Sequence, residues 1–414
     1  MRYRRPEYPS GTAPVLSRRQ LLLVGASGLL TGCSSGLGGG SDQLQSSLAG
    51  TQTQVPTAST LSGAAVKAGL LLPFGKGGDA GQTAAALKQA AELALFDVNG
   101  ANVALIPKDS GGTAESAAAA ARDVIAAGAE LIIGPLFAQE VLGVAPIARQ
   151  ANIPIVAFSN DRTVAGNGVY LLSFLAGDDV GRVIAYANVT GRHTFAALIP
   201  QTPYGAVVEK AFRVAAINAN GQIAAIEHYM AGANGFAEPI ARLKAALDKA
   251  KAGGTPVDAL LLPGGPDILP IVAPMLPYNQ IDTKTVKLLG TGSWDYPAVT
   301  KEAGLLGGWF AGSDPAAWKD FSDRYAKTYG AAPVRLASLG YDAVTLALAL
   351  AANPAGQRFT PDKLTRTSGF AGVDGLFRLK PDGTCERGLA VLEVAQFGTH
   401  VVDAAPSAFA VAQF

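Results

Sequence analysis

A glycine-rich loop at residues 75–80 is the segment whose residue types come nearest to a cofactor site. Gly75-Lys76-Gly77-Gly78-Asp79-Ala80 follows an apolar run and matches the G-x-G-x-x-G/A spacing of dinucleotide-binding loops. Backbone N–H groups of such a loop can bind an anion where a helix begins. The acid expected about 20 residues later would be Asp97, but it lies inside a predicted helix. We therefore expect the loop, with Phe74 before it, to line a cleft, and we expect no cofactor.

Other residue types that commonly do chemistry form no recognisable motif. The three histidines, His193, His228 and His400, are far apart, and G-x-S-x-G, H-E-x-x-H and C-x-x-C patterns are absent from the sequence. A zinc site or a Ser/His nucleophile has no support from this spacing. Cys385 lies between a turn and an apolar run, which favours a packed side chain over a nucleophile. We expect no metal site, and the sequence offers no catalytic motif.

Polar and aromatic side chains follow several predicted strands, and these are the candidate ligand-binding residues. Directly after the strand predicted at 153–158 come Ser159, Asn160, Asp161 and Arg162. Tyr204 opens a helix after another strand, and Trp294 and Asp295 follow a third. The C-terminal ends of parallel strands meet at one edge of a sheet and commonly bind ligands. Plainer alternatives stay open: a solvated loop for the polar residues, and packing at a helix start or hinge for the aromatic ones.

Short apolar runs alternate with amphipathic stretches along most of the chain. Strands are predicted at residues 66–72, 103–107, 131–134, 153–158, 169–175, 195–200, 223–229, 259–263 and 286–291. Helices are predicted at residues 81–98, 114–127, 139–150, 204–219, 236–252 and 267–276. Continuous apolar strands separated by helices indicate parallel sheets covered on both faces. The predicted fold class is therefore α/β, with two Rossmann-like lobes because a new series begins after residues 169–175.

Length and composition fit a folded protein with more than one compact unit. The chain has 414 residues, whereas one domain usually has roughly 100–200. Lys and Arg total 33 and Asp and Glu total 32, so the net charge of +1 does not favour a nucleic-acid partner. Hydrophobic residues make up 49% and charged residues 16%, which permits a large core and excludes the disordered class.

The N-terminus has the pattern of a lipoprotein export signal over residues 1–33. Arg18-Arg19 precedes an apolar run of about ten residues, too short to span a bilayer, which takes about 20. The run ends in Leu30-Thr31-Gly32-Cys33, which resembles a lipobox, and the arginine pair resembles a twin-arginine signal. We expect Cys33 to be acylated and to anchor the chain to membrane lipid in the periplasm. An ordinary signal peptide is the alternative.

Residues 34–65 are rich in Gly, Ser and Thr, and this composition predicts a flexible linker.

Five motifs in a fixed order carry a family resemblance. They are Ile133-Gly134-Pro135-Leu136, Pro154-Ile155-Val156-Ala157, Pro203-Tyr204-Gly205, Gly340-Tyr341-Asp342-Ala343-Val344 and Gly369-Phe370-x-Gly372-x-x-Gly375-x-Phe377-Arg378. Together they resemble the type I periplasmic binding proteins of the leucine-binding branch, and within it most closely the penicillin-binding protein activator lipoproteins. The resemblance implies two lobes with parallel central sheets, three hinge crossings, and a cleft between the lobes for a ligand or partner.

The expected crossings define two discontinuous lobes. We place them near Ala176, Gly312 and Phe377, because residues 318–329 and 339–351 have helical apolar spacing and would return to the first lobe. The N-terminal lobe is then 66–176 plus 312–377. The C-terminal lobe is 177–311 plus 378–414.

The resemblance also allows ligand anchors to be compared residue by residue. Leucine-type receptors hold a ligand carboxylate with a Ser and a nearby Thr, and the ammonium with an acid of the second lobe. The Ser position aligns with Ala138, next to Phe137, and the acid aligns with Gly292. Tyr204 retains the cleft aromatic, and Asp295 is a replacement acid. Phe137 and Ala138 remain cleft candidates, but ordinary α-amino-acid capture is disfavoured because charge-assisted bonds of about 1.5–3 kcal/mol would be missing.

Two functions follow as expectations. The first is a non-catalytic lipoprotein that activates a peptidoglycan synthase, on the outer membrane because Ser34 rather than Asp follows Cys33. The alternative is a solute receptor that delivers an amino acid or a related small metabolite to the permease of an ABC importer.

Overall fold

The structure is a computed structural model that describes residues 65–98, 102–230 and 235–409. The predicted signal segment, Cys33 and the linker up to residue 64 lie outside the described residues. Within the described residues, we find no helix with the length and apolar character needed to cross a bilayer.

The first sheet has five parallel strands in the order β2-β1-β3-β4-β5. Its strands are β1 (Val66–Leu72), β2 (Val103–Asp109), β3 (Leu131–Ile133), β4 (Ile155–Ala157) and β5 (Val169–Leu171). The helices between them are α1 (Gly78–Asp97), α2 (Ala114–Ala126) and α3 (Ala138–Gln150). The strand predicted at 66–72 matches β1 residue for residue. A continuous apolar run is typical of a strand at the centre of a sheet that is covered on both faces.

The second sheet has seven strands in the order β15-β14-β10-β9-β8-β6-β7. They are β6 (Thr194–Pro200), β7 (Gln222–Tyr229), β8 (Ala259–Leu261), β9 (Lys287–Gly290), β10 (Trp309–Gly312), β14 (Ala390–Ala395) and β15 (Gly398–Asp403). Its helices are α4 (Asp178–Val189), α5 (Pro203–Asn218), α6 (Ala237–Ala252) and α7 (Leu269–Tyr278). Strands β6 to β10 pair in parallel, whereas β14 and β15 add an antiparallel edge; β14 lies within residues 389–397, whose apolar run predicts a strand.

Both faces of the second sheet are buried, as the alternation along β6 shows. Ala196 and Leu198 belong to one core, and Phe195, Ala197 and Ile199 belong to the core on the opposite face. Successive side chains of a strand point to opposite faces, so each core receives every second residue. The predicted α/β class with parallel central sheets is therefore confirmed.

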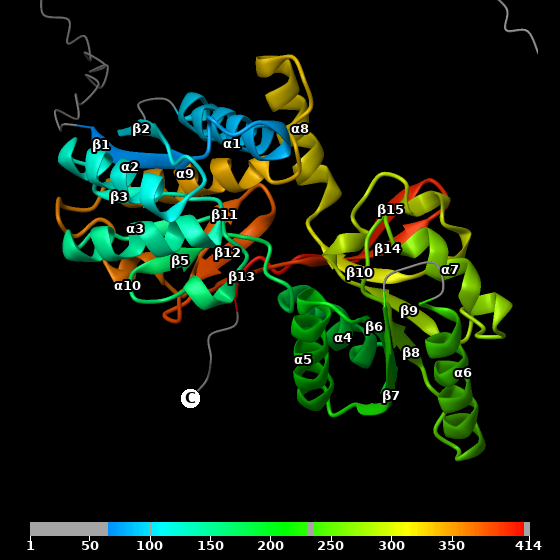
Figure 1. Cartoon of the computed structure of the whole chain (residues 1–414). Helices are drawn as coiled ribbons and strands as arrows, with labels where there is room; N and C mark the ends of the chain where they lie inside the picture. The colour runs from blue at the N-terminus through cyan, green and yellow to red at the C-terminus, as the bar shows by residue number, and fades with distance from the viewer. Residues whose placement is uncertain (1–64, 99–101, 231–234, 410–414) are drawn as a thin grey trace, which may run out of the picture. The chain divides into compact units, whose positions relative to one another are not determined.

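Two late helices pack beside α1, and the second of them completes the first core. They are α8 (Pro315–Tyr329) and α9 (Ala337–Ala351), and α9 packs along α1, as Figure 1 shows. Leu339, Val344 and Leu346 of α9 are fully buried in the core that contains β1. The helices approach so closely that a Cβ at Gly340 would overlap the carbonyl oxygen of Leu87. This contact explains why glycine occupies that position.

The third crossing lies later than predicted. The chain passes to the second sheet between β5 and α4, returns between β10 and α8, and passes again between β13 and β14. A small antiparallel sheet, β11 (Phe370–Gly372), β12 (Gly375–Leu379) and β13 (Cys385–Arg387), packs against the first core through Phe377, Leu379 and Cys385. The crossing expected near Phe377 is therefore corrected to the segment after Arg387. The alternating apolar residues on both sides of the turn at Asp382 and Gly383 could have indicated a hairpin, and the sequence analysis did not use them.

Candidate functional site

A cleft of about 700 Å³ lies where the ends of strands from both sheets meet the three crossings. Of the ten predicted ligand-binding residues, five line it: Asn160, Asp161, Arg162, Tyr204 and Asp295. The crossings contribute Phe174, Ser313 and Leu389, among others. This volume is within the range of about 300–1,000 Å³ that small-molecule sites occupy.

Arg162 and Asp178 form an ion pair across the first crossing. Asp161 caps a short 3-10 helix, η1 (Arg162–Val164), by accepting from the N–H of Thr163 at 2.9 Å. This cap positions Arg162, whose Nη2 donates to the carbonyl of Ala176 at 3.1 Å and lies 3.6 Å from Asp178 Oδ1. Burial raises the pKa of Asp178 to about 6, although the Arg162 charge opposes the rise. The sequence analysis placed a crossing near Ala176 but did not single out Asp178 as a site residue.

Tyr204 is held by two hydroxyl side chains of the second sheet. It lies at the start of α5, where Thr202 caps the helix and Pro203 occupies the first turn. Its hydroxyl lies 2.8 Å from Thr291 Oγ1 and 3.3 Å from Ser293 Oγ. Burial raises the pKa of Tyr204, so the hydroxyl stays protonated and can donate. The ring can therefore form an ordered wall of the cleft.

Asp179 fixes the backbone beside the two hydroxyl residues that hold Tyr204. Its Oδ1 accepts from the N–H groups of Gly177 and Val180, and its Oδ2 accepts from the N–H of Gly292, each at 2.8 or 2.9 Å. A carboxylate has about four acceptor sites, and backbone N–H groups take three of those of Asp179. Asp179 thus shapes the cleft and leaves its neighbours to contact a ligand.

The hinge wall of the cleft contains two arginines that the sequence did not single out. Arg335 donates to Ser313 Oγ at 2.9 Å and to Asp374 Oδ1 at 2.6 Å. Arg387 forms an ion pair with Asp342 at 3.3 Å, and both guanidinium groups lie over the Phe174 ring, 4.9 and 4.8 Å from its centre. Arg387 directly precedes the third crossing, which was a signal in the sequence, whereas Arg335 lies between α8 and α9 and has no such signal.

Trp294 is a packing residue, in contrast to the prediction that it faces a ligand. Its ring is fully buried, and its Nε1 donates to the carbonyl of Leu262 at 3.0 Å. It packs beside Phe310, with ring centres 6.3 Å apart. The neighbouring Asp295 does line the cleft and lies 3.6 Å from Arg335 Nε. The ion pair with Arg335 engages the Asp295 carboxylate, which was expected to replace the ligand-binding acid of the leucine-type receptors.

The structure places the other candidates outside the residues that line the cleft. Ser159 is buried and accepts from the N–H of Asp161 at 3.2 Å. Phe74, Phe137 and Ala138 lie near the ends of β1 and β3; Phe74 and Ala138 pack against the first core, and the Phe137 ring centre lies 5.6 Å from Lys76 Nζ. Phe137 begins α3, and its N–H donates to the buried Glu140 at 3.2 Å.

The glycine loop is occupied by a carboxylate of the chain itself. Asp109 accepts from the N–H of Gly75 at 3.0 Å and from the N–H of Gly111 at 2.9 Å. These donors are of the kind that would bind a phosphate in a dinucleotide site. The loop therefore has an internal acceptor where the motif would require a ligand.

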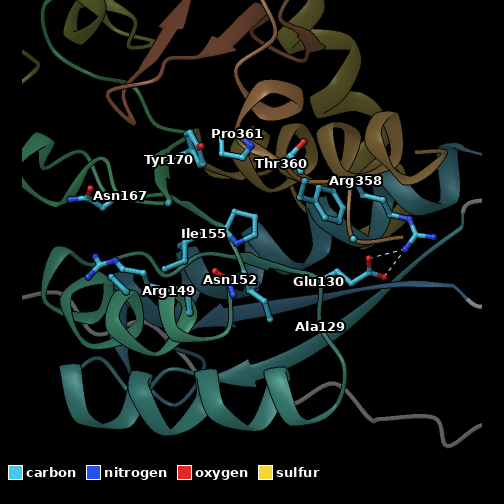
Figure 2. Close-up of a pocket in the computed structure, with 17 residues that line it drawn as sticks. Ala129, Glu130, Arg149, Asn152, Ile155, Asn167, Tyr170, Arg358, Thr360 and Pro361 are labelled. Carbon is cyan, nitrogen blue, oxygen red and sulfur yellow. Dashed lines mark hydrogen bonds and ion pairs between the residues drawn. The ribbon is translucent and has the colours of Figure 1, made fainter. Parts of the chain in front are cut away.

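A second cavity, of about 510 Å³, lies at the opposite end of the first sheet (Figure 2). Residues at the starts of β4 and β5, such as Ile155 and Tyr170, line it together with a loop from 356 to 361. Figure 2 shows Glu130 and Arg358 joined at one end, where Arg358 Nη1 donates to both carboxylate oxygens at 2.8 and 2.7 Å. Parallel sheets bind ligands at the C-terminal ends of their strands, so the 700 Å³ cleft is the better candidate.

Metal binding and thiol chemistry find no support in the described part of the chain. There, no three His, Cys, Asp or Glu side chains are grouped as a metal site requires. Cys385 is buried, and burial raises the pKa of its thiol to about 12. A thiol in that state is not a nucleophile near neutral pH.

Comparison with known proteins identifies the family. The family model described as periplasmic binding protein matches residues 65–399. This chain belongs to that family. It is a type I periplasmic binding protein, similar to leucine-binding proteins, and membership implies an extracytoplasmic location and a generally non-catalytic role.

Solved structures of the family share the fold at low sequence identity. A protein of Rhodospirillum rubrum assigned to branched-chain amino acid ABC transport is 21% identical, with a TM-score of 0.69, and covers 82% of this chain and 100% of its own. An ABC transporter substrate-binding protein of Sphaerobacter thermophilus is 20% identical (TM-score 0.63; 82% and 97% covered). A solute-binding protein of Rhodopseudomonas palustris in complex with 3,4-dihydroxybenzoic acid is 18% identical (TM-score 0.54; 83% and 99% covered). No curated protein matches the chain.

Proposed function

We propose that this periplasmic binding protein is a solute receptor that delivers a small metabolite to an ABC importer. The observation that carries the proposal is the cleft, because residues from the two sheets and from the three crossings line one cavity of about 700 Å³. A ligand bound there would contact both lobes and favour their closure by hinge motion. The similar structures assigned to ABC transport, and the one in complex with an aromatic acid, support this role.

Thermal unfolding with a panel of amino acids, aromatic acids and short peptides tests the receptor function. A ligand at 100 times its Kd adds about 2.7 kcal/mol to the free energy of unfolding, which raises the Tm by several degrees. A flat response to the whole panel would count against a solute receptor.

A second candidate function is activation of a peptidoglycan synthase. It is favoured by Ala138, which stands where the leucine-type receptors carry a carboxylate-binding Ser, and by the motif resemblance to the activator lipoproteins. The purified protein should then raise the glycan polymerisation rate of a synthase from the same cell. If the polymerisation rate did not change and a ligand raised the Tm, the activator function would be rejected and the receptor function would stand.

We also propose that Cys33 carries the lipid anchor, on the outer membrane because Ser34 follows it. The support is the order of basic residues, apolar run and Leu30-Thr31-Gly32-Cys33 in the sequence. Cys33→Ala should move the protein from the detergent phase to the aqueous phase in a phase-partition experiment. Recovery of both forms in the aqueous phase would contradict the anchor.

A further inference from the structure

The cavity of about 510 Å³ at the opposite end of the first sheet has an apolar floor made by the first core. Three of its lining side chains, Ala148, Ile155 and Phe359, are at most 6% exposed and belong to that core. Figure 2 shows the loop from 356 to 361 on one side of the cavity and the end of α3 on the other. An apolar cavity of this volume that carries a few polar groups is typical of a small-molecule site.

Tyr170 lines this cavity with a hydroxyl that the protein does not use. The residue lies in β5 and is 5% exposed. Its hydroxyl has no hydrogen-bond partner among the described residues, and it keeps accessible surface, unlike the Tyr296 hydroxyl, which is both unpartnered and fully enclosed. Burial raises the pKa of Tyr170 above the usual 10, so the hydroxyl stays protonated and can donate. An acceptor on a molecule in the cavity can therefore bind this hydroxyl.

The charged side chains around the cavity leave one cation unpaired. Arg358 donates to both carboxylate oxygens of Glu130, and its Nε donates to the carbonyl of Ala351 at 3.1 Å. Arg149, exposed in the last turn of α3, has no ion pair and no side-chain hydrogen bond among the described residues. Figure 2 shows Arg149 on one side of Ile155 and the Glu130–Arg358 pair on the other. The lining therefore has one positive charge in excess, away from the closed pair.

Backbone acceptors at this end of α3 are already taken. The carbonyl of Ala148 accepts from the N–H of Ile153 at 2.9 Å, and the carbonyl of Arg149 accepts from the N–H of Asn152 at 3.1 Å. The open groups are then the guanidinium of Arg149 and the hydroxyl of Tyr170, which donate. A ligand that supplies acceptors to both complements the cavity.

We propose that this cavity is a second ligand site, separate from the cleft, and that it binds a small carboxylic acid that carries a further oxygen on an aromatic or aliphatic body. The carboxylate would accept from Arg149, because a carboxylate matches a guanidinium in shape and charge. The second oxygen would accept from Tyr170, and the body would pack on Ile155 and Phe359. The inference does not depend on the receptor function, since the cleft lies at the other end of the strands.

Calorimetric titration of hydroxy acids tests the second site. The titrations use the full chain with Val207→Trp, whose new side chain fills the cleft and so leaves the second cavity to be measured. The probes are 4-hydroxybenzoate, 4-hydroxyphenylacetate and 6-hydroxyhexanoate, each beside its amide and beside the parent acid that lacks the hydroxyl. At least one hydroxy acid should bind about ten or more times more tightly than its amide and several times more tightly than its parent acid. If no probe binds, or if none of the hydroxy acids shows these preferences, the proposal is overturned and the receptor function of the cleft is unaffected.

Two tryptophan variants on α3 assign the binding to this cavity. Ala145 lines the cavity, so Ala145→Trp should fill it and weaken binding at least tenfold. Leu142 lies on the same helix, is 63% exposed and is not part of the lining, so Leu142→Trp is the matched control and should leave the Kd unchanged. Equal affinities of the two variants would overturn the proposal.

Two smaller substitutions assign the contacts, and they decide the outcome if Ala145→Trp does not fold. Arg149→Gln should abolish the preference for the acid over its amide, and Tyr170→Phe should abolish the preference for the hydroxy acid over its parent acid. Arg122→Gln, at an exposed position of α2 outside the cavity, is the control for the loss of one charge and should keep both preferences. An unchanged preference in Arg149→Gln or in Tyr170→Phe would contradict the proposed binding mode.

Discussion

Single buried charges set how the cleft responds to pH. Asp178 lies beside the first crossing, and burial raises the pKa of its carboxyl to about 6, above the usual 3.8. The folded protein therefore binds this proton more tightly than the unfolded chain does. The sign follows from linkage: the contribution of Asp178 to stability falls as the pH rises from about 4 through 6.

Asp178→Asn should therefore stabilise the protein more at pH 8 than at pH 5. The expected difference is on the order of 1–2 kcal/mol, since one pKa unit corresponds to about 1.4 kcal/mol and loss of the Arg162 contact offsets part of the gain. Urea unfolding at the two pH values measures it. Asp323→Asn, at an exposed position on α8, is the control and should show no such dependence. An effect of Asp178→Asn that is the same at both pH values would contradict the raised pKa.

At the scale of elements, the contact between α1 and α9 joins the start of the chain to a segment late in the sequence. Gly340→Ala would force the two helices apart, because the new Cβ would overlap the backbone of Leu87. We expect a loss of about 1–3 kcal/mol in the free energy of unfolding. Gly181→Ala in α4 is the matched control, since its Cβ would meet no atom within 4 Å and alanine favours a helix. Equal stabilities of the two variants in urea would refute the close packing.

The elements that the sequence predicted well are those whose apolar runs are long and regular. β1 was predicted to the residue, and α2 to within one residue, because Thr113 and Ser116 form a capping box at its start. β10 was missed, because Trp309–Gly312 is too short to show a period. Residues 378–387, which hold the end of β12 and all of β13, were assigned to the wrong lobe, because sequence periodicity does not say against which sheet a strand packs.

The part of the candidate site that directly follows strands could be predicted from the sequence, and the rest could not. Arg162 and Tyr204 follow strands, so the rule on strand ends placed them in the cleft. Arg335 and Arg387 lie far along the chain from both, and they reach the cleft because the crossings bring them together. Trp294 also follows a strand, yet the fold turns its ring inward, which the spacing could not show.

At the scale of the whole molecule, the first core depends on segments that the second lobe separates in the sequence. Leu339 and Leu346 of α9 and Phe377 of β12 complete the core that contains β1 to β5. A fragment of residues 66–176 lacks these side chains, and each buried leucine or phenylalanine contributes about 1.5–3 kcal/mol. We expect this fragment to be unfolded or aggregated in circular dichroism and light scattering. A cooperative thermal transition of the fragment would contradict the shared core.

The central claim is that a small solute binds in the cleft lined by α5 and the three crossings. Val207 and Val214 both lie on α5 and are 41% and 50% exposed, but only Val207 is among the residues that line the cleft. The most direct measurement is calorimetric titration of a thermal-shift ligand into Val207→Trp and Val214→Trp. We expect the Trp at 207 to fill the cleft and weaken binding at least tenfold, and the Trp at 214 to leave the Kd unchanged. Wild-type affinity in Val207→Trp would contradict the claim.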